Sequence, residues 1–274
     1  MENVIVQIVE ILKYGFIQKA LIGGIMTGIS CALLGVFLVL KKQSFIGDGL
    51  AHVSFASAAC ALLLGQEPFI ISIPVVICVS FIILMIEERA RINPDAAIAL
   101  VSSISIALGV VFASVSKGFS VDLYGYLFGS ILTIKSGEVI LSIIVSILLI
   151  TVVLLFYNEL FISAFDSDFA LVSGISTKRI NYVTAIVTAV AIVTGIKVVG
   201  TMLISSLLIF PAVTALQIAK GFKQTLIISL IVSIFSVIAG IIFSVLANIP
   251  TGASIVLVNG IIFLFVFLIA RKLR

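Results

Sequence analysis

The chain has 274 residues, of which 62% are hydrophobic and only 10% are charged, and its formal net charge is +4 at pH 7. Soluble domains carry roughly 25% charged residues, and several apolar stretches here reach the roughly 20 residues that cross a bilayer. These values exclude a soluble globular protein. The positive charge does not indicate nucleic-acid binding, because Lys and Arg stand at the ends of apolar runs. We therefore expect an all-α polytopic membrane protein with a single domain over residues 1–274.

Nine apolar runs are candidate membrane spans, and residues 3–19 ahead of them are expected to form a short interfacial helix. The runs cover about residues 20–40, 49–65, 69–86, 96–116, 138–157, 181–196, 198–217, 225–247 and 253–270. The sixth and seventh runs are short and meet at Lys197, so one of them could be re-entrant. The pattern predicts eight or nine membrane-spanning helices.

The stretch LYGYLFGSIL within residues 117–137 differs from these runs. It is interrupted by glycine and is too short to cross a bilayer. It favours a short surface helix or a re-entrant helix.

The basic residues predict the orientation of the spans. An odd number of spans places the two termini on opposite sides of the membrane. With the C-terminus inside, eleven Lys and Arg residues lie in inner segments and five in outer segments, as the positive-inside rule favours. The outer residues are Lys13, Lys19, Lys117, Lys135 and Lys197. The C-terminus is therefore expected to be cytoplasmic.

Two residues of the seventh run are candidate gate or kink positions. Pro211 interrupts the run and should kink a helix. Gly200 stands near the start of the same run. For Pro211, a static kink is at least as compatible with the sequence as a moving gate.

The second run opens with GDGLAHVSF, which contains the only histidine of the chain, His52, four residues after Asp48. On a helix this spacing places both side chains on one face. A carboxylate with an imidazole suits Zn²⁺, Mn²⁺ or Fe²⁺. Two ligands make a weak, transient site, because stable zinc sites use three or four. Such a site fits transport, and a second copy of the chain around an axis would double the number of ligands.

The same residues also have a structural interpretation. Asp48 would cap the second helix at its N-terminus, with Gly47 and Gly49 as turn residues beside it. His52 would then be a satisfied polar residue within the bundle. The residues alone leave both interpretations open.

Residues 158–180 form the longest polar segment of the chain. Phe161, Phe165, Phe169 and Val172 would share one face of a short amphipathic helix lying on the inner membrane surface. Apolar side chains held on an inner segment suggest a docking surface for a cytoplasmic partner. An ordinary linker on the membrane surface would show the same pattern.

The sequence contains no motif for ATP hydrolysis or for hydrolytic catalysis. No GxxxxGK[ST], HExxH or GxSxG string occurs. We therefore expect a protein that is not an enzyme and has no nucleotide site of its own. A missing motif does not exclude an intramembrane enzyme, but no residue pattern argues for one.

Five strings occur in an order that is known from one protein family. They are KKQSFIGDGLAHVSFAS (Lys41–Ser57), VDLYGYLFGSIL (Val121–Leu132), AFDSDFALVSGI (Ala164–Ile175), VVGTMLISSLLIFPAVTALQIA (Val198–Ala219) and IPTGASIVL (Ile249–Leu257). Over roughly residues 20–270, the chain resembles the ZnuB-like (ABC-3) membrane permease subunits of zinc, manganese and iron ABC importers.

The resemblance implies a fold, a substrate and a set of partners. The fold would be the all-helical bundle of type II ABC importers. The partners would be a second copy of this chain, two cytoplasmic ABC ATPase subunits, an extracytoplasmic metal-binding protein and membrane lipid, with no nucleic acid. No permanently bound cofactor is expected, because Zn²⁺ or Mn²⁺ would be the transported substrate. The location would be the bacterial plasma membrane.

The resemblance also assigns site residues by position. Asp48 and His52 match the family's membrane-embedded metal-pathway pair. Residues Phe165 to Gly174 match the cytoplasmic segment that couples the permease to its ATPase. Its candidate coupling residues are Phe165, Asp166, Asp168, Ala170 and Gly174.

The sequence departs from the family pattern at Ser130, which follows Phe128-Gly129 where zinc-type relatives often carry an acid. If that acid contacts metal at the outer mouth, the entry site of this chain lacks it. The strings VDLYGYLFGSIL and SSLLIFPAVTA nevertheless favour the zinc branch of the family over the manganese branch.

The hypothesis is a permease that works by alternating access, in which the ion passes Asp48 and His52 along a dimer axis. One alternative is an ion-coupled secondary transporter that acts without an ATPase, although such proteins usually carry more ionisable residues within their spans. Another is a non-transporting scaffold or sensor, in which Asp48 and His52 could be replaced freely.

Overall fold

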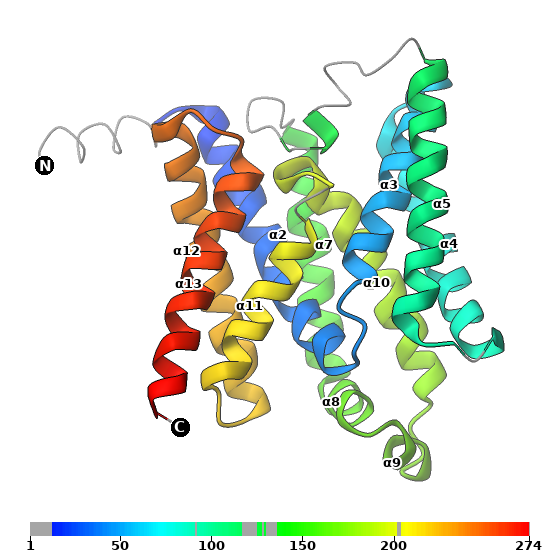
Figure 1. Cartoon of the computed structure of the whole chain (residues 1–274), viewed down its shortest axis with the longest axis vertical. Helices are drawn as coiled ribbons and strands as arrows, with labels where there is room; N and C mark the ends of the chain where they lie inside the picture. Colours follow the sequence, from blue (N-terminus) through cyan, green and yellow to red (C-terminus); the bar gives the residue numbers. More distant parts are fainter. Residues whose placement is uncertain are drawn as a thin grey trace, which may run out of the picture.

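The chain folds as a bundle of helices, and the computed structural model describes residues 13–90, 92–116, 125–127, 129, 136–201 and 204–273. All regular secondary structure in these residues is helical (Figure 1). The helices are α2 (Gly15–Leu40), α3 (Ile46–Leu63), α4 (Pro68–Ala90), α5 (Pro94–Val115), α7 (Ser136–Leu155), α8 (Tyr157–Phe165), α9 (Ser167–Val172), α10 (Thr177–Val199), α11 (Ile204–Ile218), α12 (Phe222–Ala247) and α13 (Thr251–Leu273). The expected all-α fold is confirmed.

Eight of the described helices are long and apolar enough to cross a membrane. α11 is shorter, with 15 residues, which is about 22 Å of helix against the roughly 30 Å of a bilayer core. Eight of the nine apolar runs fall largely on one helix each, and the seventh run, 198–217, begins at the end of α10 and continues on α11. The prediction of eight or nine spans is therefore confirmed, with α11 as the helix that makes the number ambiguous.

The first span begins earlier than the sequence suggested. Residues 3–12 of the expected interfacial helix lie outside the described residues, and α2 begins at Gly15 rather than near residue 20. Lys19 therefore belongs to α2. A lysine this close to a helix end can pack its apolar stem against the bundle and keep its ammonium group in water. Its charge is therefore compatible with a helix that begins at Gly15.

The break between the sixth and seventh runs lies at Gly200 rather than at Lys197. α10 continues through Lys197 to Val199, and Gly200 follows with a φ of 92°, a conformation that glycine adopts without steric cost. Pro211 lies inside α11, where it removes the N–H that the carbonyl of Leu207 would otherwise accept. The kink and gate roles of Gly200 and Pro211 stay predictions.

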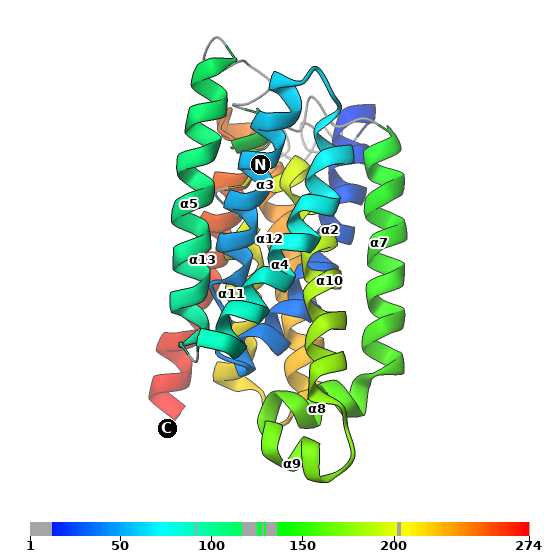
Figure 2. The same cartoon turned by 90° about the vertical axis from the view of Figure 1, so that its right-hand side faces the viewer.

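Consecutive long helices run in opposite directions, so the connections alternate between two ends of the bundle (Figures 1 and 2). α2 begins at the end opposite to the C-terminus, whereas α8 and α9 lie at the C-terminal end. Most basic residues of the described ranges also stand at the C-terminal end, namely Lys41, Lys42, Arg89, Lys178, Arg179, Lys220, Lys223, Arg271 and Lys272. The two ends of the bundle therefore differ in their number of basic residues.

α2 is the central helix and packs against α7, α10, α11 and α12. A Cβ atom added to Gly35 would lie 1.9 Å from the carbonyl oxygen of Leu208 in α11, so the two backbones touch there. At Gly28, a Cβ atom would lie 2.9 Å from the Oγ of Ser233 in α12, and this hydroxyl donates to the Gly28 carbonyl at 2.9 Å. The small residues of α2 thus allow close packing within one chain.

Candidate metal passage and coupling segment

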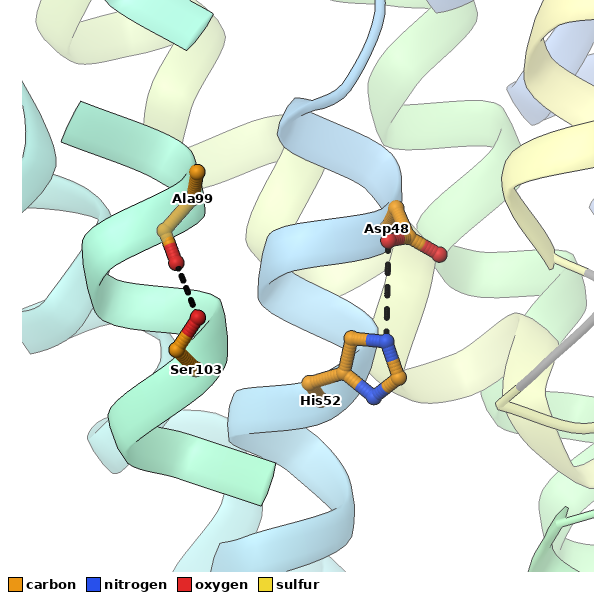
Figure 3. Close-up of polar contacts among 4 residues, drawn as sticks. All are labelled: Asp48, His52, Ala99 and Ser103. Atoms are coloured by element: carbon orange, nitrogen blue, oxygen red, sulfur yellow. Dashed lines mark hydrogen bonds and ion pairs between the residues drawn. The ribbon is translucent and has the colours of Figure 1, made fainter. Parts of the chain in front are cut away.

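The first turns of α3 hold Asp48 and His52 on one face, as their spacing predicted. The distance from His52 Nε2 to Asp48 Oδ2 is 3.5 Å (Figure 3). α3 begins at Ile46, its N-cap is Phe45, and no side chain caps it. Asp48 is therefore not the N-cap that the structural interpretation required, and its carboxylate faces His52 instead. Its place in the first turn still favours a negative charge through the helix dipole.

The pair is reachable from outside the chain although α3 is largely buried. The side chain of His52 is 17% exposed and that of Asp48 is 42% exposed, whereas most other α3 residues are buried. Figure 3 shows both side chains on the side of α3 that faces away from the labelled turn of α5, where the Ser103 hydroxyl donates to the Ala99 carbonyl at 2.9 Å. Both side chains therefore keep part of their surface exposed on this face of α3.

Two glycines beside Asp48 set the position of this turn. A Cβ atom on Gly47 would lie 2.5 Å from Cδ1 of Leu208 in α11, and one on Gly49 would lie 2.6 Å from Cγ2 of Ile98 in α5. The sequence suggested that both were turn residues, which is wrong, because both lie inside α3. They are small because α11 and α5 pack against α3 at these points.

The donor set of the pair is incomplete. Within the described ranges, no group of three or more His, Cys, Asp or Glu side chains could hold a metal ion. One imidazole and one carboxylate fit a divalent first-row transition metal in kind, but stable zinc sites use three or four protein ligands. The described residues of a single chain therefore lack the three or four protein ligands of a stable zinc site.

The glycine-interrupted stretch of residues 123–132 is described only at residues 125–127 and 129. Residues 125–127 are helical, as expected, and Tyr126 is buried, with its hydroxyl 2.8 Å from Oγ of Ser54 in α3. The backbone carbonyl of Tyr126 also accepts the N–H of Thr201, beside the break between α10 and α11, at 3.1 Å. Ser130 lies outside the described residues. Tyr126 had no sequence signal beyond its place in this stretch.

The polar segment forms two helices rather than the single amphipathic helix that the sequence suggested. The chain breaks between α8 and α9 at Asp166, whose backbone is extended. The Asp166 carboxylate accepts the N–H groups of Asp168, at 3.0 Å, and Phe169, at 2.9 Å. Asp166 is therefore the N-cap of α9, and a continuous helix through residues 161–172 is excluded.

Gly174 ends α9 in a left-handed conformation, with a φ of 79°. Its N–H donates to the carbonyl of Leu171 at 3.1 Å, and the N–H of Ile175 donates to that of Ala170 at 2.9 Å. These are the two hydrogen bonds of a Schellman motif, in which glycine is favoured because it tolerates positive φ. The side chain of Ala170 is fully buried. Ala170 and Gly174 therefore determine the conformation of the segment and do not form its exposed surface.

Apolar side chains cover the outside of the segment. Phe165 is 61% exposed, Phe169 is 58% exposed and Val172 is 87% exposed. Phe161, expected on the same face, instead packs inward, with its ring centroid 4.8 Å from that of Phe222 at the start of α12. The exposed apolar surfaces of Phe165, Phe169 and Val172 lie at the C-terminal end of the bundle, as a protein-docking surface would require.

Phe222 connects the segment to the core of the bundle. Its ring lies 5.4 Å from that of Phe37 near the end of α2, and 5.4 Å from that of Tyr157 at the start of α8, measured between centroids. The ring of Phe165 lies 6.3 Å away. This aromatic cluster places α8, α12 and the end of α2 in direct contact, and the sequence gave no signal that its members would meet.

A polar cavity of about 300 Å³ lies between the segment and the connection from α2 to α3. Its lining includes Lys41, which donates to Oδ1 of Asn181 in α10 at 2.7 Å. Burial lowers the pKa of Lys41 to about 8, although the nearby carboxylate of Glu87 opposes this change. The connection between α2 and α3, which leads to Asp48, is thus joined to α10 by a hydrogen bond from the partly buried Lys41.

Comparison with known proteins identifies one family over most of the chain. The family model described as "ABC 3 transport family" matches residues 13–270. This range includes both α3 and the α8–α9 segment.

Relatives of known function and a solved structure agree with this match. The manganese transport system membrane protein MntC of Listeria innocua is 33% identical, over 96% of this chain and 93% of its own length. The high-affinity zinc uptake system membrane protein ZnuB of Haemophilus influenzae is 30% identical, over 93% of this chain and 97% of its own. The structure of PsaBC from Streptococcus pneumoniae in complex with Fab matches with a TM-score of 0.86 and 31% identity, covering 96% of this chain and 95% of that one. The names of these relatives include both manganese and zinc.

Proposed function

This chain belongs to the ABC 3 transport family and is a permease subunit of a metal ABC importer, and we propose that it carries Zn²⁺ or Mn²⁺ across the bacterial plasma membrane by alternating access. Energy would come from two separate cytoplasmic ATPase subunits. An extracytoplasmic metal-binding protein would deliver the ion. The sequence-based preference for zinc stays a prediction, because an imidazole with a carboxylate suits both metals.

The observation that carries the proposal is the partly exposed Asp48–His52 pair on α3. Asp48 and His52 contact each other, keep part of their surface exposed and have no third ligand among the described residues. A second copy related by a two-fold axis would bring an identical pair to the same axis. The resulting set of two carboxylates and two imidazoles would bind a divalent ion well enough to admit it and loosely enough to release it.

The charge distribution supports an orientation with the C-terminus in the cytoplasm. Nine of the Lys and Arg residues in the described ranges stand at the end of the bundle that holds the C-terminus, and three stand at the other end. The positive-inside rule places the basic end in the cytoplasm. Asp48, near the start of α3, would then lie toward the inner side, and α8 and α9 would face the ATPase subunits.

The α8–α9 segment would connect ATP hydrolysis to the passage. Phe165, Phe169 and Val172 would enter the ATPase surface, while Asp166 and Gly174 would hold the shape of α9. A displacement of α8 would be transmitted to the end of α2 through the aromatic rings packed around Phe222. From there the α2–α3 connection leads directly into the turn that carries Asp48.

Vesicle uptake tests this function. The full chain, together with its co-purified ATPase, is reconstituted, and uptake of Zn²⁺ and Mn²⁺ is followed with loaded binding protein and with or without ATP. We expect uptake only with ATP and the ATPase. Uptake by the chain alone under an ion gradient would instead identify a secondary transporter, and no uptake under any condition would favour a scaffold. Competition between the two metals measures which one is preferred.

A further inference from the structure

An apolar groove of about 540 Å³ opens between α2, α7 and α12. Leu226, Ile227, Leu230 and Ile234 form its α12 wall, and α2 and α7 supply the remaining aliphatic side chains. Only two lining residues, Tyr157 and Lys223, have polar side chains. The groove is therefore an apolar channel with polar groups supplied by those two residues alone.

The length and position of the groove match one leaflet of a bilayer. Ile234 stands eleven positions after Lys223 on α12, which corresponds to about 16 Å along the helix axis. Half of a bilayer's hydrocarbon core is about 15 Å thick. α12 begins at the C-terminal end of the bundle (Figure 1), so the groove runs from that membrane surface to about the centre of the membrane.

The mouth of the groove presents hydrogen-bond donors without partners. Lys223 is exposed, and its ammonium group forms no hydrogen bond or ion pair with any residue that the structure describes. The Tyr157 hydroxyl likewise has no partner in the described part of the chain, although its ring packs on Phe222. Neither Asp nor Glu lines the groove. A cation and a phenol at the level of the membrane surface fit an anionic acceptor such as a phosphate.

We propose that this groove binds an anionic phospholipid from the leaflet on the C-terminal side. One acyl chain lies along α12, and the head-group phosphate accepts hydrogen bonds from Lys223 and Tyr157. A second copy of this chain fits the groove less well. The proposed function already places the two-fold axis at Asp48 and His52 of α3, and no α3 residue lines the groove.

The absence of tryptophan from the sequence gives a direct test. Ile227 is 49% exposed on the groove wall, and Ile231, one turn later, is 61% exposed and lies outside the groove. Each is replaced by tryptophan in the full chain, which is reconstituted in phosphatidylcholine vesicles. A small fraction of brominated-acyl phosphatidylglycerol or brominated-acyl phosphatidylcholine is then added. We expect the anionic lipid to quench the tryptophan fluorescence of the Ile227→Trp protein several-fold more than the neutral lipid does. Both lipids should quench the fluorescence of the Ile231→Trp protein equally.

A second substitution assigns the preference to the mouth of the groove. Lys223→Gln in the Ile227→Trp protein should abolish the preference for the anionic lipid, whereas Lys272→Gln, at an exposed lysine of the same end, should keep it. Equal quenching of Ile227→Trp by the two lipids would overturn the proposal and leave only bulk lipid at this surface. Quenching of Ile231→Trp without quenching of Ile227→Trp would also overturn it, because protein would then cover the groove.

Discussion

The Asp48/His52 pair and the α8–α9 segment are built in opposite ways. The pair sits in a packed helix, and its position depends on distant residues, because Gly47 and Gly49 admit side chains of α11 and α5. α9 takes its shape from its own ends, where Asp166 caps one end and a Schellman motif closes the other. One region exposes polar side chains inside an apolar bundle, and the other exposes apolar side chains at its basic end. The first suits an ion, and the second suits a protein.

The largest effect is expected at the pair. In the proposed site, His52→Ala removes one of the two metal ligands of each copy, so ATP-driven metal uptake in vesicles should fall by more than about 100-fold, beyond the loss that is typical when an outer-shell partner of a metal ligand is removed. Expression and co-purification of the ATPase should not change, because His52 lies far along the chain from the α8–α9 segment. Ser103→Ala, which removes a hydroxyl bonded only within its own helix, is the matched control. Wild-type uptake by His52→Ala would show that the pair is structural.

The next effect should appear in the segment without affecting the pair. Phe169→Ala truncates an exposed aromatic side chain, and loss of such an anchor from an interface costs roughly 2 kcal/mol, or about 30-fold in affinity. Binding of the purified ATPase, measured by surface plasmon resonance, should weaken by this factor while thermal stability stays the same. Phe235→Ala, which truncates a phenylalanine of α12 that is 60% exposed, should bind normally. Equal binding by both variants would place the docking surface elsewhere.

Gly47→Ala tests whether the pair depends on packing. The new Cβ atom would lie 2.5 Å from Cδ1 of Leu208, and overpacking of this kind typically costs about 1–3 kcal/mol. The midpoint of thermal unfolding in detergent should therefore fall, and Gly15→Ala, with open space around it, should leave it unchanged. Leu208→Ala removes the opposing atom, so the double variant should be more stable than the sum of the two effects implies. Additive effects would disprove the contact.

A smaller effect tests the local construction of α9. Asp166→Ala removes the carboxylate that caps the helix, which typically costs about 1 kcal/mol. If α9 must be formed before the ATPase binds, affinity should fall by up to about fivefold. Asp166→Asn should restore most of it, because an amide oxygen also caps. Equal loss in the Ala and Asn variants would mean that the charge matters more than the cap.

The smallest effect concerns the connection that links the two regions. The pKa of Lys41 is about 8 in the folded chain and about 10.4 when unfolded. Between these values the unfolded chain binds a proton that the folded chain has released, so the stability of the wild type should rise with pH above about 8. Lys41→Met should lose this rise, and Lys42→Met should keep it. If the stability of the wild type and that of Lys41→Met changed with pH in the same way, Lys41 would not be buried in solution.

Much of the fold follows from run length and charge. All nine apolar runs became helices, because a run of about 20 apolar residues has no other stable form in lipid. The spacing of Asp48 and His52 was sufficient to place them together, since it depends only on the helical period. The order of the five strings identified the family, which local patterns alone could not do.

Features that depend on contacts between distant residues were missed or wrongly assigned. Gly47 and Gly49 looked like turn residues because sequence shows the absence of a side chain but not the neighbour that fills the space. The 158–180 segment looked like one helix because Asp166 fits both a helix surface and an N-cap. Phe222 had no signal at all, because its four aromatic neighbours come from residues 37, 157, 161 and 165.

Leu208 touches two glycines at once, its backbone against Gly35 of α2 and its side chain against Gly47 of α3. Neither glycine has a side chain that could rearrange if the packing at its contact changed. The start of α3, the middle of α11 and the adjoining part of α2 are therefore in close contact, and we expect them to move together. Asp48 lies in the first turn of α3, so we expect any movement of Asp48 during a transport cycle to displace the adjoining parts of α11 and α2 as well.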